Sequence, residues 1–145
     1  MKNESLIKSR KRVKDFGEVY TPPRIVKEMC DLVPQWSLEQ TFLEPACGNG
    51  NFLVEVLKRK LAMCANADDI RIAVCSIYGV DLLSDNVREA KARMYEMIRN
   101  AGVSFDAEEI LLVLNLNVQQ GDFLMKTKAN GKPLIFVDWR KLGWI

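Results

Sequence analysis

The stretch TFLEPACGNGNFL, Thr41 to Leu53, contains a short apolar run, an acid, a glycine-containing turn and the start of an apolar helix. This succession predicts a strand, a turn and a helix. Glycine allows the backbone of such a turn to adopt positive φ and to approach a ligand closely. The helix that follows points free N–H groups at the same place, which favours a small ligand with a negative end. The stretch therefore predicts a ligand site at the end of a strand.

Apolar runs and amphipathic segments alternate along the rest of the chain. The run AVCSIYGVDLL, residues 73–83, ends near Asp81 and is typical of a strand buried on both faces of a parallel sheet. The expected strands lie at 42–44, 73–83, 114–119 and 133–137, and the expected helices at 22–34, 51–63 and 84–100, with a short helical turn after Asp106. This order predicts a doubly wound, mainly parallel α/β sheet with ligands bound outside the carboxyl ends of its strands.

Composition narrows the class of protein. A chain of 145 residues with 48% hydrophobic content can form one domain with a core, expected at 16–145 after a basic segment at 1–15. The absence of histidine and of C-x-x-C spacing argues against a zinc site, a disulfide framework and histidine-activated nucleophiles. No run is long enough to span a membrane, and the charged start is unlike a signal peptide, so we expect no membrane partner and a cytoplasmic location.

The glycine turn fits some nucleotide-like ligands better than others. Gly48 and Gly50 give part of the dinucleotide fingerprint, but Leu53 replaces the third glycine, and Asp81 follows Gly50 by 31 residues where about 20 are expected. A P-loop is excluded, because no Gly-Lys-Ser/Thr follows the turn. An adenosine with a methionine tail explains more residues, since it needs a close backbone, an acid for the ribose hydroxyls, and an apolar slot with an acceptor.

Four segments supply these features in order: GEVYTPP at 17–23, LEPACGNGNFL at 43–53, GVD at 79–81 and GDFL at 121–124. They resemble consecutive motifs of the S-adenosylmethionine-dependent DNA adenine-N6 methyltransferases of restriction–modification systems. The resemblance covers about residues 15–125, and its first two motifs are the specific ones. It implies a Rossmann-like methyltransferase fold, S-adenosylmethionine as cofactor and double-stranded DNA as substrate.

The resemblance also implies cofactor contacts for the residues that match the motifs. These residues are Tyr20, Thr21, Glu44, Ala46, Cys47, Gly48, Gly50, Asp81, Asp122 and Phe123. Tyr20 and Thr21 would contact the methionine end, and Glu44 with the 46–50 backbone would lie under the amino and sulfonium groups. The three remaining residues would bind the ribose hydroxyls (Asp81), the adenine amine (Asp122) and the adenine ring (Phe123). Each also has a purely structural explanation, such as a helix cap, a turn or the core, and their grouping favours the cofactor.

Methylating an adenine requires further groups that hold the flipped base. In this family an Asn/Asp-Pro-Pro-Tyr/Phe motif after the fourth strand holds the base, and the sequence contains no such motif. Asp138 and Trp139 lie where it would fall and are weak catalytic candidates, because Trp139 is equally explained as a packed aromatic. We therefore expect a methyltransferase fold that is incomplete at its C-terminal side and inactive alone.

The basic residues Lys8, Arg10, Lys11 and Arg12 are candidates for DNA-phosphate contacts, although a solvated terminus explains them as well. Three functions remain open. The chain is the cofactor-binding part of a DNA adenine-N6 methyltransferase, a subunit completed by a specificity or complementary methyltransferase partner, or a non-catalytic module that binds DNA or protein. An open sheet edge would favour self-association or pairing with a partner.

Overall fold

The computed structural model describes residues 5–145, so that residues 1–4 of the predicted basic segment lie outside the described residues. One sheet has the order β1–β2–β3–β4. Its strands are β1 (Phe42–Glu44), β2 (Ile77–Asp81), β3 (Val118–Asp122) and β4 (Thr127–Lys128). The first three are parallel, and the two-residue β4 runs antiparallel to β3. The predicted mainly parallel α/β fold is confirmed.

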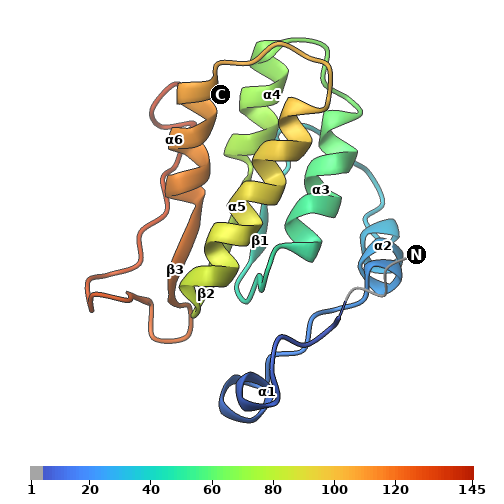
Figure 1. The fold of residues 1–145 in the computed structure, drawn as a ribbon. Helices are drawn as coiled ribbons and strands as arrows, with labels where there is room; N and C mark the ends of the chain where they lie inside the picture. The colour runs from blue at the N-terminus through green and yellow to red at the C-terminus, as the bar shows by residue number, and fades with distance from the viewer. Residues whose placement is uncertain (1–4) are drawn as a thin grey trace.

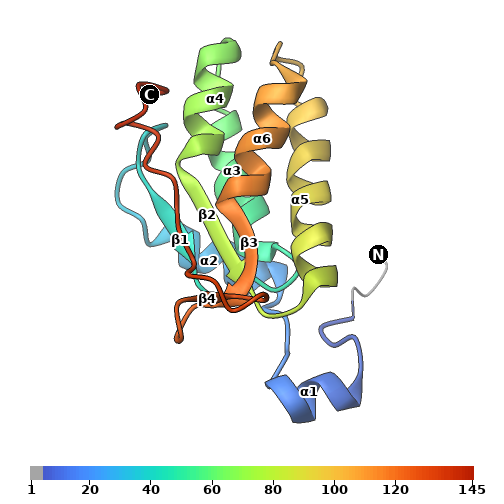
Figure 2. The ribbon, with the colours of Figure 1, turned by 90° about the vertical axis from the view of Figure 1, so that its left-hand side faces the viewer.

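The described helices are α1 (Arg10–Phe16), α2 (Pro23–Asp31), α3 (Asn51–Leu61), α4 (Ala67–Cys75), α5 (Ser84–Arg99) and α6 (Ala107–Asn117). Helices α3, α4, α5 and α6 lie on one face of the sheet, and the segment 133–145 crosses the other face (Figures 1 and 2). Each parallel connection therefore moves in the same direction across the sheet, which is the arrangement in one half of a doubly wound fold.

Helix α4 was not expected, and it shortens the predicted strand at 73–83. Asn66 caps this helix by accepting a hydrogen bond from the Asp69 amide (3.0 Å), and residues 73–75 form its last turn before β2. In the same way α6 extends through Asn117, so that β3 begins only at Val118. Both errors occur where a buried helix runs directly into a buried strand, because an apolar run alone does not distinguish the two.

The strand expected at 133–137 is wrong. In this segment the structure shows only an isolated bridge between Thr127 and Pro133. The chain instead lies against the sheet face, where the Tyr78 hydroxyl donates a hydrogen bond to the Val137 carbonyl (2.7 Å) and the side-chain Nε2 of Gln119 donates to the Ile135 carbonyl (2.8 Å). The C-terminal segment therefore covers one face of the sheet rather than extending its edge.

A buried lysine fixes the amino-terminal side of the sheet. Lys60 is fully buried, and its ammonium donates to the carbonyls of Ser37 (3.1 Å), Leu38 (2.8 Å) and Gln40 (2.6 Å) and to the Ser76 hydroxyl (2.7 Å). Burial lowers the pKa of Lys60 to about 8, so the ammonium remains protonated at pH 7. Lys60 thus connects α3 to the loop that leads into β1 and to the residue before β2.

We predict that Lys60→Met lowers the free energy of unfolding by about 2–3 kcal/mol, because three carbonyl oxygens lose their donor. Lys58→Met is the matched control, since Lys58 lies on the same helix but is exposed, and it should change stability by less than about 0.5 kcal/mol. Urea unfolding followed by circular dichroism measures both variants. Equal stability of the two variants would contradict the assignment of Lys60 as an anchor.

Candidate functional site

A cavity of about 610 Å³ opens at the carboxyl ends of the parallel strands. Its lining comes from four segments: residues 16–21, most of 44–52, 81–83 and 121–124. Each segment includes residues of one of the four sequence motifs, which lie far apart in the chain. The volume is within the range of small-molecule and cofactor sites. The structure therefore brings the motifs together around one space large enough for a ligand.

The charge of the cavity lining has one sign. Glu18, Glu44, Asp81 and Asp122 line the cavity, and no lysine or arginine does so among the described residues. Burial raises the pKa of Glu44, although a hydrogen bond from the Ala46 amide (3.2 Å) partly offsets this effect. Such a lining disfavours a phosphate-bearing ligand and favours one with a positive group. The dinucleotide alternative is weakened further by this arrangement.

Two hydrogen bonds beside the cavity attach the turn after β1 to strand β2. The Cys47 amide donates to the Val80 carbonyl (2.8 Å), and the Gly48 amide donates to Asp81 Oδ1 (3.1 Å). Asp81 Oδ2 accepts a further hydrogen bond from the Leu83 amide (3.1 Å). Burial raises the pKa of the Cys47 thiol to about 12, so that this cysteine is neutral and serves as a wall rather than a nucleophile.

The two glycines of the turn have different roles. Gly48 lines the cavity at φ +53°, and a Cβ there would lie 3.1 Å from the Tyr20 ring. Gly50 is not part of the lining. It stands before α3 at φ +98°, where a Cβ would lie 2.9 Å from the Cβ of Ala90 on α5. Gly50 therefore allows α3 and α5 to pack closely, and the structure does not bring it to the cavity.

The other predicted cofactor residues line the cavity. They are Tyr20, Thr21, Glu44, Ala46, Cys47, Gly48, Asp81, Asp122 and Phe123. Thr21 does not cap α2 with its side chain, because Pro22 occupies the N-cap position without a side-chain hydrogen bond. Asp122 also shapes the turn that follows β3, since its Oδ1 accepts from the Met125 amide (3.1 Å).

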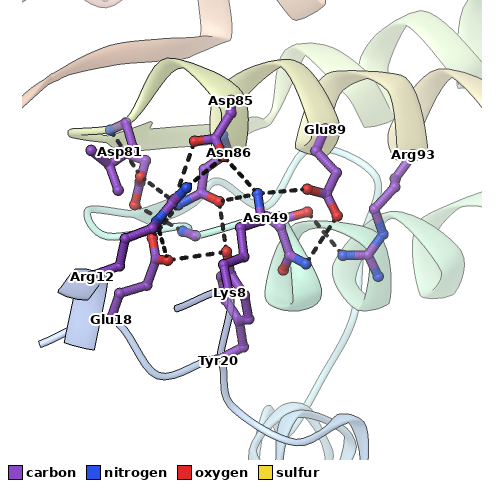
Figure 3. A network of polar contacts seen from close by, with 12 residues as sticks. Lys8, Arg12, Glu18, Tyr20, Asn49, Asp81, Asp85, Asn86, Glu89 and Arg93 are labelled. Carbon is purple, nitrogen blue, oxygen red and sulfur yellow. Dashed lines mark hydrogen bonds and ion pairs between the residues drawn. The ribbon is translucent and has the colours of Figure 1, made fainter. Parts of the chain in front are cut away.

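Helix α1 is held by charges rather than by apolar burial, because none of its residues is buried. Arg12 donates to both carboxylate oxygens of Asp85 (2.6 and 3.1 Å) and to Glu18 Oε2 (2.9 Å), as Figure 3 shows. The Lys8 ammonium lies 2.9 Å from Asp85 and from Glu89. Hydrogen bonds from Arg12 hold the pKa of Asp85 well below its usual range, despite an opposing contribution from burial.

These contacts change the picture of the four basic residues proposed for DNA. Lys8 and Arg12 are engaged with acids of the same chain, whereas Arg10 and Lys11 are exposed on α1. The structure thus separates the basic run into two residues that attach α1 to α5 and two that face solvent.

Asp138 and Trp139 lie at the opposite end of the sheet from the cavity. Trp139 is 3% exposed and donates through Nε1 to Oδ1 of Asn117 (2.8 Å), the residue before β3. Asp138 accepts from the Arg140 amide (3.2 Å). The Asn117 amide group also donates to the Ile77 carbonyl (3.0 Å). The structure therefore places Trp139 in the core, and it does not bring either residue to the cavity.

Comparisons with known proteins show the family of the chain. The sequence profile of the family described as N-6 DNA Methylase matches residues 4–121. The chain belongs to this family. It is 30% identical over 131 residues to the type II methyltransferase M.VspI of Vibrio sp. (strain 343), a match that covers 90% of this chain and 29% of that protein.

A crystal structure is also similar to this N-6 DNA methylase chain. It is a modification subunit assigned to a type I restriction enzyme in Vibrio vulnificus YJ016, with 29% identity and a TM-score of 0.48. The match covers 69% of this chain and 21% of that one. The chain thus spans less than a third of each relative.

Residues that sequence reasoning missed lie around the motifs of this N-6 DNA methylase chain. Asn86 is fully buried in the first turn of α5 and contacts Asp81, Glu18 and Tyr20. Arg93, on α5, donates to the carbonyl of Asn49 (2.8 Å) and so stabilises the glycine turn. A polar residue beside the apolar stripe of α5 was the available signal for Asn86, but two of its partners, Glu18 and Tyr20, are distant in sequence.

Neither a metal-binding group nor a membrane-spanning helix is seen in the part of the chain that the structure describes. No group of three His, Cys, Asp or Glu residues within 5–145 could hold a metal ion. No helix in the same range is long and apolar enough to cross a bilayer.

We predict that Gly50→Ala destabilises the chain by about 3 kcal/mol, because strain at positive φ adds to the clash with Ala90. Gly102→Ala is the control, since Gly102 has φ +73° but open space around its Cβ position, and it should cost only about 1 kcal/mol. Thermal or urea unfolding measures the difference. Similar losses for both variants would mean that α3 and α5 do not pack as closely as described.

Proposed function

We propose that the chain binds S-adenosylmethionine in this cavity, as the cofactor-binding part of a DNA adenine-N6 methyltransferase of a restriction–modification system in the cytoplasm. One observation carries the proposal. Four motif segments from separate parts of the chain line a single cavity that contains four acids and no lysine or arginine within the described residues. Membership of the N-6 DNA methylase family supports the same methyl donor and a double-stranded DNA substrate.

The ribose contact is assigned to Asp81, with one modification of the initial expectation. A carboxylate offers about four acceptor positions. Asp81 already accepts from the amides of Gly48 and Leu83 and from the side chain of Asn86. Oδ1 accepts only one of these bonds, so we assign one ribose hydroxyl to Oδ1 rather than a pair of hydroxyls to the whole carboxylate.

The remaining contacts follow the cavity lining. Tyr20 and Thr21 would contact the methionine end, with Asp122 and Phe123 at the adenine. Glu44 would lie near the sulfonium, where a carboxylate stabilises a positive charge. The bound donor would supply an electrophilic methyl group; its transfer would also require groups that hold the adenine amine in line with the donor and accept the proton that the amine loses.

We propose that the groups that hold the flipped base come from outside this cavity. Asp138 and Trp139 receive no catalytic role, because the structure places them at the other end of the sheet. Of the four basic residues proposed for DNA, Arg10 and Lys11 are the two that remain available to a DNA backbone. The relatives are more than three times longer than the matched region, so a longer chain or a partner subunit is the proposed source of the base-handling groups.

A partner subunit is favoured as a second candidate arrangement by one observation. In the described sheet β1 pairs with β2 alone, so its other edge is open, and Leu43 on this strand is 44% exposed. An open edge is a site for strand pairing with another chain or a second copy.

We predict saturable binding of S-adenosylmethionine with a micromolar dissociation constant. Gly48→Val should weaken this binding at least tenfold, because a branched side chain at φ +53° would meet the Tyr20 ring and fill the cavity. Gly102→Val is the control, since it places the same side chain at positive φ far from the cavity motifs. Isothermal titration calorimetry measures all three proteins. Equal affinity of the Gly48→Val and Gly102→Val variants would exclude this cavity as the binding site.

We also predict that Glu44→Gln reduces affinity for S-adenosylmethionine more than for S-adenosylhomocysteine, because only the former carries the positive sulfonium. The ratio of the affinity for S-adenosylmethionine to that for S-adenosylhomocysteine should fall by about threefold to tenfold relative to the wild type. The pKa of Glu44 is raised, so its carboxylate is neutralised at a higher pH than an ordinary one. The wild-type preference should therefore fall as pH decreases through this raised pKa, while the variant stays flat. If the wild-type affinities for both ligands fell by the same factor as the pH decreases, the role of Glu44 would be refuted.

A further inference from the structure

We propose that Asn86 is a positioning residue that orients the Asp81 carboxylate toward the ribose and joins it to the N-terminal wall of the cavity. The inference rests on the proposed cofactor function and adds to it a residue outside the four motifs. Asn86 does not line the cavity and would act only through the groups that it contacts.

The contacts of Asn86 link two walls of the cavity directly. Its Nδ2 donates to Asp81 Oδ2 (3.0 Å) and to Glu18 Oε2 (2.6 Å). Its Oδ1 accepts from the Tyr20 hydroxyl (2.8 Å) and from the Lys8 ammonium (3.0 Å). Figure 3 shows the side chain between these four groups. Asp81 belongs to the sheet wall, whereas Glu18 and Tyr20 belong to the segment before α2.

The chemistry of these partners fixes the orientation of the amide. Two carboxylates face the NH₂ group and two donors face the oxygen, so a flipped amide would set its oxygen against both acids. The side chain is fully buried, and both ends of the amide are satisfied. A buried and satisfied polar group of this kind holds its neighbours in one geometry.

Ion pairs hold the N-terminal segment against the first turn of α5, which contains Asn86. Arg12 and Lys8 contact Asp85, the residue before Asn86, and Arg12 also contacts Glu18. Burial of Glu18 opposes its ionisation, but hydrogen bonds from Arg12 and Asn86 outweigh it and lower the pKa of Glu18. Glu18 thus stays ionised at neutral pH and remains an acceptor for Asn86. The segment and α5 are connected from both sides of the amide.

Asn86 would affect the affinity for a ligand that contacts Tyr20 at one end and Asp81 at the other, because it holds both residues in place. Without the Asn86 amide, Asp81 keeps its two backbone donors but loses the side-chain donor that sets the rotation of its carboxylate. The ribose contact should then weaken selectively. General loss of stability would weaken every analogue of the ligand by the same factor.

The test compares S-adenosylhomocysteine with its 2′-deoxy and 3′-deoxy analogues by titration calorimetry. Loss of the hydroxyl that contacts Asp81 should weaken binding to the wild-type chain about tenfold. In Asn86→Leu this ratio should fall to about threefold or less. Asn117→Leu is the matched control, because Asn117 is another fully buried asparagine that lies at the opposite end of the sheet, and it should keep the wild-type ratio.

An unchanged ratio in a folded Asn86→Leu protein would overturn the inference and leave the proposed function intact. Failure of the folded wild-type chain to bind S-adenosylhomocysteine would refute the proposed function, and the inference with it. If the ratio between S-adenosylhomocysteine and its deoxy analogue also fell in Asn117→Leu, the inference would be overturned, because any loss of a buried asparagine would then have the same effect.

If Asn86→Leu does not fold, Asn86→Asp provides the measurement. It keeps the shape but sets a third carboxylate beside Asp81 and Glu18, and such groups share a proton. Affinity of this variant for S-adenosylhomocysteine should rise at least threefold from pH 8 to pH 5.5 relative to the wild type, as the carboxylates share a proton. A pH profile parallel to that of the wild type would overturn the inference.

Discussion

The hydrogen bond from the Gly48 amide to the Asp81 carboxylate, 3.1 Å long, is the contact on which the cavity depends. Parallel pairing of β1 with β2 places the carboxyl ends of both strands at one edge of the sheet. The Gly48–Asp81 bond then joins the turn that follows the first strand to the acid that ends the second. Gly48 is held at positive φ by this contact and leaves room for the Tyr20 ring. Two of the four walls are therefore joined by the Gly48–Asp81 hydrogen bond, and Asn86 with the ion pairs of Arg12 attaches the third.

The part of the site that follows from strand order could be predicted from the sequence. An acid at the end of each apolar run, such as Glu44, Asp81 and Asp122, must reach the same edge once the strands are parallel. The limits of helices and strands were less predictable where α4 and α6 run into β2 and β3 without a turn. The C-terminal segment also has strand-like residues, but its backbone lies on the sheet face and makes few strand hydrogen bonds.

Residues whose role depends on distant partners could not be assigned from their local pattern. Gly50 belongs to the glycine turn, yet its conformation serves the approach of Ala90 on α5. Trp139 follows an acid near the place expected for base-handling residues, yet its indole donates to Asn117 in the core. Asn86 has no motif, but it contacts both walls of the cavity. The deciding neighbour of Trp139 is 22 residues away in sequence, and that of Gly50 is farther. Asn86 has one near partner, Asp81, but Glu18 and Tyr20 are 68 and 66 residues away.

The distribution of charge explains how an acidic cavity can coexist with a nearly neutral chain. Lys8 and Arg12 stand outside the lining and stabilise Asp85 and Glu18, so the positive charges needed for docking α1 do not enter the cavity. Of the four lining acids, Glu18 is paired with Arg12, whereas Glu44, Asp81 and Asp122 form no ion pair with the described residues. Since like charges in a confined space repel, a cationic ligand lowers the free energy of this arrangement, whereas a phosphate raises it. The same ion pairs that engage Lys8 and Arg12 therefore keep these two positive charges out of the lining, which supports the proposed sulfonium cofactor.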